Sequence, residues 1–279
     1  MGLFSNTKKN DKGEMTFLSH LEEMRWRMVR CSVFIVIFAA LIFIFTKDVI
    51  DIIYLSMMKT DFPTYQMFCK VSHLSGAGDA LCIESLNFKL QSTTVMGQFS
   101  TNMFMAIVGG IVCAFPVIAY QIWQFVKPAL KSKELDASKG FIFYSTILFF
   151  FGIAFGYFLV SPLGVQFFGN YSMTDDIDSL QNIFTISSYM NLITTSTFFS
   201  GLLFELPIIV AILTRIGVVS PAFLRKYRKH SIVVVLILSA IITPPDMISQ
   251  VIVSIPIIIL YEIGILVSKR IEKQKATTA

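Results

Sequence analysis

Residues 32–45 read SVFIVIFAALIFIF and contain no charged side chain. The stretch just before them, HLEEMRWRMVRC at 20–31, carries two carboxylates and three arginines. An apolar run of about 18 residues or more is typical of a membrane-spanning helix, and the run at about 28–45 reaches that length. The sequence therefore predicts a first membrane span with a group of charges at its start.

The composition extends this conclusion to the whole chain. Hydrophobic residues make up 54% of the 279 residues and charged residues 15%, unlike a soluble globular domain. The net charge of +5 does not predict nucleic-acid binding, because the basic residues fall in short clusters between apolar runs, as in cytoplasmic loops. We expect an integral protein of the lipid bilayer.

Six apolar stretches are separated by charged or Pro/Gly-containing breaks. They lie at about 28–45, 100–126, 141–161, 191–214, 231–243 and 247–267. Nineteen of the 23 Lys and Arg residues fall in the N-terminal tail, the second and fourth loops and the C-terminus, which places both termini in the cytoplasm by the positive-inside rule. We expect an all-α, six-helix, multi-pass unit over residues 1–279 in the cytoplasmic membrane, N-in and C-in.

The last two spans are expected to be short. Ser231 to Thr243 rises only about 20 Å, against a hydrocarbon core of roughly 30 Å. The TPPD sequence at 243–246 predicts a tight outer turn, because neither proline can continue a helix. We expect this helix pair to thin the membrane locally or to lie against protein.

The first outer loop, at about 46–99, is the only extended one. Its sequence KDVIDIIYLSMM at 47–58 predicts a short amphipathic helix at the membrane interface. Cys69 and Cys82 follow on the oxidising side of the membrane, where they would either form a disulfide or remain as two free thiols.

The sequence contains no catalytic or metal-binding motif. HExxH and GxSxG are absent, the four cysteines lack CxxC spacing, and the three histidines lie outside the span centres. A hydrolase or a metal site would require such patterns. We therefore expect neither an enzyme nor a cofactor or metal.

Glu205, in GLLFELPIIVAIL at 201–213, is the clearest ionisable residue inside a span, where a charge is costly. Pro207 removes the usual helical donor to the Leu203 carbonyl, so the sequence predicts a carboxyl beside an unpaired acceptor. Glu205 would be either a protonated group hydrogen-bonded inside the bundle, or a polar contact for a partner helix or a proton-linked step.

The segment at 16–27 predicts a cytoplasmic amphipathic helix that leads into the first span. Its apolar stripe consists of Phe17, Leu21, Met24 and Met28. Glu23, Arg27 and Arg30 share the opposite face. Ser19 and Glu22 fit a capping box, whereas Glu23 has only an i,i+4 pair with Arg27, worth a few tenths of a kcal/mol on a surface.

Five segments, in order along the chain, resemble the TatC family, the receptor subunit of the twin-arginine protein translocase. HLEEMRWR at 20–27 resembles the family signature HLxELRxR. The others are FVKPALKSKE at 125–134, FELP at 204–207, TPPD at 243–246 with Gln250, and YEIG at 261–264. The resemblance covers nearly the whole chain and implies a non-enzymatic receptor.

The resemblance also implies which residues recognise the signal peptide of a folded cargo protein. Glu23 and Glu134 would bind its twin-arginine motif, and the same cytoplasmic site would include Arg25, Phe125 and Pro128. Arginine presents a planar fork that a carboxylate can bind through two hydrogen bonds, which lysine cannot imitate. Two arginines therefore call for two acidic partners.

A second implied region is the docking site for the single-span partner subunits of the TatA and TatB types, at Glu205 and Gln250. The family implies self-association in a larger complex and export of folded proteins driven by the proton-motive force. The alternative is a small secondary transporter or ion-conducting protein with Glu205 as its midplane carboxylate. Such a protein should have an internal repeat and polar residues in several spans, and we find neither pattern.

Overall fold

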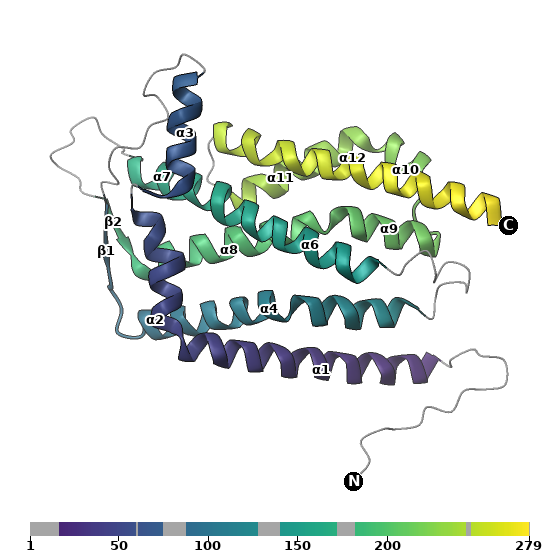
Figure 1. The fold of residues 1–279 in the computed structure, drawn as a ribbon, viewed down its shortest axis with the longest axis horizontal. Helices are drawn as coiled ribbons and strands as arrows, with labels where there is room; N and C mark the ends of the chain where they lie inside the picture. The colour runs from purple at the N-terminus through teal and green to yellow at the C-terminus, as the bar shows by residue number, and fades with distance from the viewer. Residues whose placement is uncertain are drawn as a thin grey trace, which may run out of the picture.

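The computed structural model describes residues 17–59, 61–74, 88–127, 140–171, 182–243 and 247–278, and the structural statements below concern these residues. They form an elongated bundle of helices (Figure 1). The elements are α1 (Phe17–Ile44), α2 (Thr46–Val49), η1 (Ile50–Tyr54), η2 (Leu55–Met58), α3 (Pro63–Leu74), β1 (Phe88–Gln91), α4 (Gly97–Val126), α6 (Phe141–Phe155), η4 (Gly156–Val160), α7 (Ser161–Asn170), β2 (Asn182–Thr185), α8 (Ile186–Phe204), α9 (Leu206–Ile216), α10 (Pro221–Lys226), α11 (Arg228–Ile242) and α12 (Met247–Thr278).

Five stretches of the described chain are helical, long and apolar enough to cross a bilayer. They are Glu22–Ile44, Gly97–Val126, Phe141–Gly169, Ile186–Ile216 and Ser249–Lys275. They match the first four predicted spans and the sixth, which confirms the class of polytopic helical membrane protein. The predicted fifth span corresponds to α11, whose 15 residues rise only about 22 Å. A sixth crossing stays a prediction.

Helix α11 is as short as the sequence predicts, whereas the expectation of a short final span is wrong for α12. Helix α12 has 32 residues and continues beyond the apolar stretch that the sequence delimits at about 267. The added residues include Lys, Arg, Glu, Gln and Ala, which are strong helix formers. The helix therefore persists after the apolar pattern ends.

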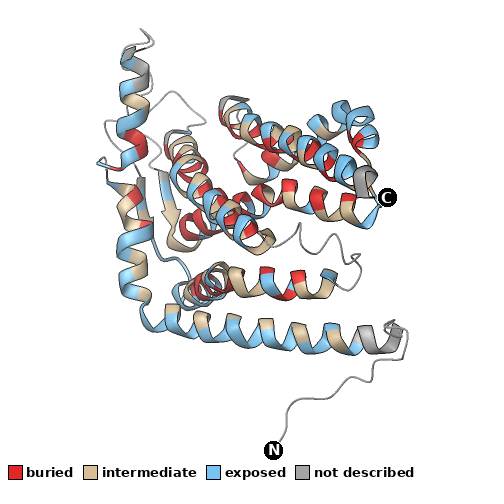
Figure 2. Ribbon diagram, turned by 45° about the vertical axis from the view of Figure 1, so that its right-hand side comes forward, coloured by how far each residue is buried: buried red, intermediate tan, exposed pale blue. Residues whose placement is uncertain are grey.

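The predicted N-terminal segment at 16–27 is continuous with the first span, because α1 runs without interruption from Phe17 to Ile44. Ser19 lies inside this helix and not at its N-cap, so the predicted capping box with Glu22 is wrong. Most of α1 is exposed, whereas the buried residues lie on the other helices (Figure 2).

The two ends of the bundle differ in character. Helix α1 begins and α12 ends at the same end, on the right in Figure 1, together with the end of α4 and with α10. We call this the basic end. Its Lys and Arg residues include Arg25, Arg27, Lys127, Arg225, Lys226, Lys269, Arg270 and Lys273. The opposite end, which we call the strand end, holds α2, α3, β1 and β2.

At the strand end, hydrogen bonds of tyrosine side chains hold η1 against α8. The Tyr54 hydroxyl lies 2.7 Å from the Thr194 hydroxyl, and Tyr189 donates to the Tyr54 carbonyl at 2.8 Å. Tyr65 donates to the Met57 carbonyl at 3.1 Å, and burial raises the pKa of Tyr65, which keeps its hydroxyl protonated. The segment at 47–58 is helical, as predicted, and its Tyr54 and Met57 are buried against protein.

Strands β1 and β2 pair in parallel, with Phe88 opposite Asn182. This small sheet is absent from the predicted all-α fold, because each strand has four residues and its partner lies far along the sequence. Cys69 in α3 is disulfide-bonded. Cys82 lies outside the described residues, so its pairing with Cys69 stays a prediction.

Glycines allow the helices of the bundle to approach closely. A Cβ atom on Gly156 would lie 2.7 Å from Thr197 Cα in α8, and one on Gly152 would lie 2.8 Å from the Ser200 carbonyl oxygen. Between α4 and α1, a Cβ on Gly110 would lie 2.8 Å from a backbone oxygen of α1. Small residues at such contacts are how helices associate in lipid.

We predict that Gly156→Ala destabilises the folded protein by about 1–3 kcal/mol, because the new methyl group meets backbone that cannot yield without moving a helix. The matched control is Gly264→Ala in α12, where the nearest atoms would lie at an ordinary 3.6 Å. That change should stay within about 0.5 kcal/mol. Denaturant titration of the purified protein in detergent measures both, and equal stabilities would refute the close-contact argument.

Candidate functional site

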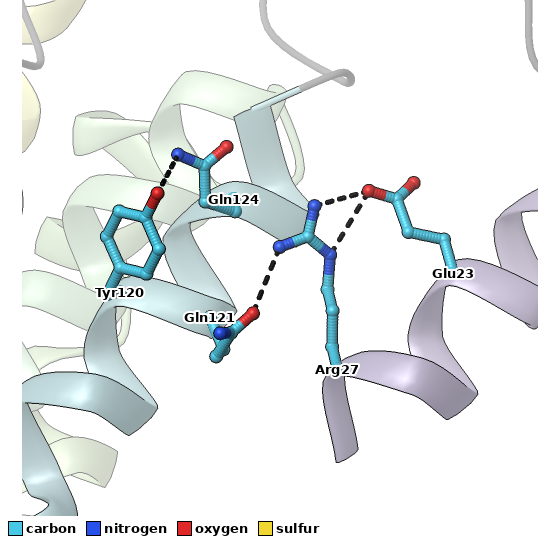
Figure 3. Close-up of polar contacts among 5 residues, drawn as sticks. All are labelled: Glu23, Arg27, Tyr120, Gln121 and Gln124. Carbon is cyan, nitrogen blue, oxygen red and sulfur yellow. Dashed lines mark hydrogen bonds and ion pairs between the residues drawn. The ribbon is translucent and has the colours of Figure 1, made fainter. Parts of the chain in front are cut away.

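Glu23 and Arg27 lie one turn apart on α1, on the side that packs against α4 at the basic end. Arg27 Nε donates to Glu23 Oε1 at 3.1 Å, and Arg27 Nη2 donates to the same oxygen. Arg27 Nη1 donates across to Oε1 of Gln121 on α4 at 3.2 Å. Figure 3 shows this chain of three side chains. The predicted i,i+4 pair is confirmed.

This ion pair is less solvated than the surface pair that the sequence predicts. The side chains of Arg27 and Glu23 are only 16% and 21% exposed. The second carboxylate oxygen, Glu23 Oε2, is buried and makes no hydrogen bond to the described residues. A carboxylate oxygen with unused lone pairs in a partly desolvated site is an acceptor for an additional donor.

Gln121 is the member of this group that sequence reasoning missed. It lies in the apolar stretch of α4 and is buried, with Tyr120 before it and Gln124 one turn later (Figure 3). A buried amide near the end of an apolar helix requires a hydrogen-bond partner, and that signal was present in the sequence. Which residue would serve as the partner depends on how α1 packs against α4.

Of the other residues predicted for the peptide site, two lie among the described residues and two do not. Arg25 is exposed and lies two residues beyond Glu23, on another side of α1. Phe125 is half-buried in the last turn of α4, at the basic end. Pro128 and Glu134 lie outside the described residues.

Glu205 lies at the junction between α8 and α9 and is buried. Ser145 on α6 donates from Oγ to Glu205 Oε2 at 2.9 Å. The other oxygen, Oε1, is buried without a hydrogen bond to the described residues. At this junction the Glu205 backbone N–H donates to the Leu202 carbonyl at 3.1 Å, and the predicted unpaired carbonyl of Leu203 stays a prediction.

Gln250 is half-buried on α12, and its Nε2 donates to the Leu236 carbonyl on α11 at 3.1 Å. This bond fastens the short α11 to α12. The bond from Ser145 to Glu205 instead joins α6 to the α8–α9 junction. The two predicted docking residues therefore belong to different helix contacts.

An apolar cavity of about 510 Å³ lies among α4, α6 and α8. Its lining includes Met105, Val112, Phe150, Ile153, Ile193 and Phe198. It is large enough to accept several apolar side chains or a lipid chain.

These features define a polytopic helical membrane protein with a carboxylate–guanidinium–amide group at one end of its bundle and a buried carboxyl in its apolar interior. The model of the family "Sec-independent protein translocase protein (TatC)" matches residues 19–256. The chain belongs to this family, a component of a protein translocase.

Individual relatives agree with this assignment. The chain is 38% identical to Sec-independent protein translocase protein TatC of Blattabacterium sp. subsp. Periplaneta americana over 270 residues, covering 96% of this chain and all of that one. It is 32% identical to TatCy of Bacillus subtilis, over 92% of this chain and 89% of the relative. The crystal structure of the twin arginine translocase receptor TatC superimposes with a TM-score of 0.69 at 28% identity, over 91% of this chain and 99% of that one.

Proposed function

We propose that this protein is the signal-peptide receptor and core subunit of a twin-arginine translocase, which exports folded proteins using the proton-motive force and catalyses no chemical reaction itself. The observation that carries the proposal is the partly desolvated carboxylate of Glu23, with one oxygen bound to Arg27 and the other buried without a hydrogen bond to the described residues. The relatives' names and the fold support it.

The recognition chemistry follows from the geometry of arginine. A guanidinium is planar and can give two parallel hydrogen bonds to one acidic group, whereas an ammonium is a compact and strongly hydrated point charge. Glu23 would bind one arginine of the signal peptide and Glu134 the other. Arg25, Phe125 and Pro128 would border the same site.

The apolar part of a signal peptide needs an apolar surface as well. The cavity of about 510 Å³ among α4, α6 and α8 offers one, and burial there would contribute about 25 cal/mol per Å² of apolar area removed from water. Charged and apolar parts of the peptide would thus bind different regions of the same bundle.

The basic end would face the cytoplasm, since Lys and Arg concentrate on the cytoplasmic side of membrane proteins, and α11 would form the sixth crossing in a locally thinned bilayer. A membrane-impermeant thiol reagent added to intact cells tests this. A cysteine at the exposed Val95 should react and one at Gln274 should not; the reverse pattern would overturn the orientation.

The intramembrane region around Glu205 and Gln250 would dock the single-span TatA- and TatB-type subunits, within a larger self-associated complex. Glu205 Oε1 is buried without a hydrogen bond to the described residues, and polar groups join helices in lipid because hydrocarbon offers no alternative partner.

We predict that Glu23→Gln weakens binding of a twin-arginine signal peptide by roughly 10- to 100-fold, because a hydrogen bond to a charged group contributes about 1.5–3 kcal/mol. Replacing both peptide arginines by lysine should have a similar effect on the native protein. Fluorescence anisotropy with the purified protein in nanodiscs measures these affinities.

The matched control is Glu22→Gln, since Glu22 is the neighbouring carboxylate on α1 and is exposed. It should bind the peptide as the native protein does. Unchanged binding by Glu23→Gln would refute the site.

We predict that Glu205→Ala abolishes export in cells but leaves peptide affinity within about twofold, because the carboxyl acts in partner docking and not in peptide recognition. The control is Glu272→Ala, an exposed carboxylate on α12, which should export normally. Loss of peptide binding in Glu205→Ala, or normal export, would contradict the docking role.

A further inference from the structure

The ion pair between Arg27 and Glu23 has an unusual arrangement. Arginine–carboxylate pairs are frequently bidentate, with each guanidinium N–H on its own carboxylate oxygen. Here Nε and Nη2 of Arg27 both donate to Oε1 of Glu23, and Oε2 is left buried without a partner among the described residues. A buried unsatisfied carboxylate oxygen is costly, so another contact must hold both N–H groups of Arg27 on the single oxygen Oε1.

Gln121 supplies that constraint. Its side-chain oxygen accepts from Arg27 Nη1 at 3.2 Å, which ties the far side of the guanidinium to α4 (Figure 3). Without this bond, the guanidinium would be able to turn in its plane and cover both oxygens of Glu23. The contact with Gln121 therefore favours the form of the pair in which Oε2 makes no hydrogen bond to the described residues.

We propose that Gln121 is a positioning residue for arginine recognition: by holding Arg27 to one side, it keeps Glu23 Oε2 open for a guanidinium of the incoming peptide. This inference rests on the proposed function. The carboxylate of Glu23 then lies between two guanidinium groups, one from the protein and one from the ligand.

The same arrangement accounts for a preference for arginine over lysine. A ligand cation at Oε2 must approach the positive charge of Arg27. A guanidinium is delocalised and weakly hydrated, whereas an ammonium is a concentrated charge that keeps its water. Arg27, held by Gln121, therefore disfavours lysine more than arginine.

The test compares Gln121→Met with Gln124→Met. Methionine keeps the length of the side chain and removes the acceptor; Gln124 lies on the same face of α4 one turn later and donates to Tyr120, not to Arg27. Affinities for a twin-arginine peptide and its twin-lysine version are measured in nanodiscs. We expect Gln121→Met to lower the arginine-to-lysine affinity ratio by on the order of fivefold, and Gln124→Met to leave it unchanged.

A positioning role also predicts that Gln121 acts through Arg27. In an Arg27→Met background, Gln121→Met should have no further effect on the ratio, whereas independent contributions would multiply. Thermal unfolding identifies any variant that fails to fold. If Arg27→Met fails to fold, the double variant is replaced by Gln121→Leu, which also lacks the acceptor and is compared with Gln124→Met.

The outcomes separate this inference from the proposed function. If Glu23→Gln binds the twin-arginine peptide like the native protein, the peptide site itself is refuted. If Glu23→Gln loses binding while Gln121→Met keeps the native affinity ratio, or adds fully to Arg27→Met, only the role of Gln121 is refuted.

Discussion

Helices in a bilayer gain little by burying apolar side chains against one another, because lipid is equally apolar. Their association in this protein depends on close backbone approach at small residues such as Gly110, Gly152 and Gly156. The hydroxyl contacts at the strand end add directional bonds to that packing. The positions of the polar residues follow from these contacts.

The close contacts at glycines set the positions of polar residues on the same helix faces. Ser145 precedes Gly152 by two helical turns, so both lie on the face of α6 that approaches α8, and Ser145 thereby reaches Glu205 at 2.9 Å. Gln121 follows Gly110 by about three turns and faces α1 in the same way, which brings it to Arg27. Glu23 and Glu205 each have one oxygen that makes no hydrogen bond to the described residues, and both carboxylates are thus placed by the packing of two helix pairs.

The sequence was sufficient for what is local or periodic. Apolar runs located α1, α4, α6, α8 and α12, and the spacing of Glu23 and Arg27 predicted their pair. It was insufficient where distant segments meet: the pairing of β1 with β2, the contact between Ser145 and Glu205, and the role of Gln121 each require knowing which helix faces are in contact. The false cap at Ser19 arose because α1 begins earlier than the motif suggests.

The most direct test of this account is an electron cryomicroscopy structure of the protein with a bound twin-arginine signal peptide. The account predicts one peptide guanidinium within hydrogen-bonding distance of Glu23 Oε2, with Arg27 still bound to Glu23 Oε1 and to Gln121. A peptide whose arginines lie away from Glu23, or one that displaces Arg27 from the carboxylate, would contradict it.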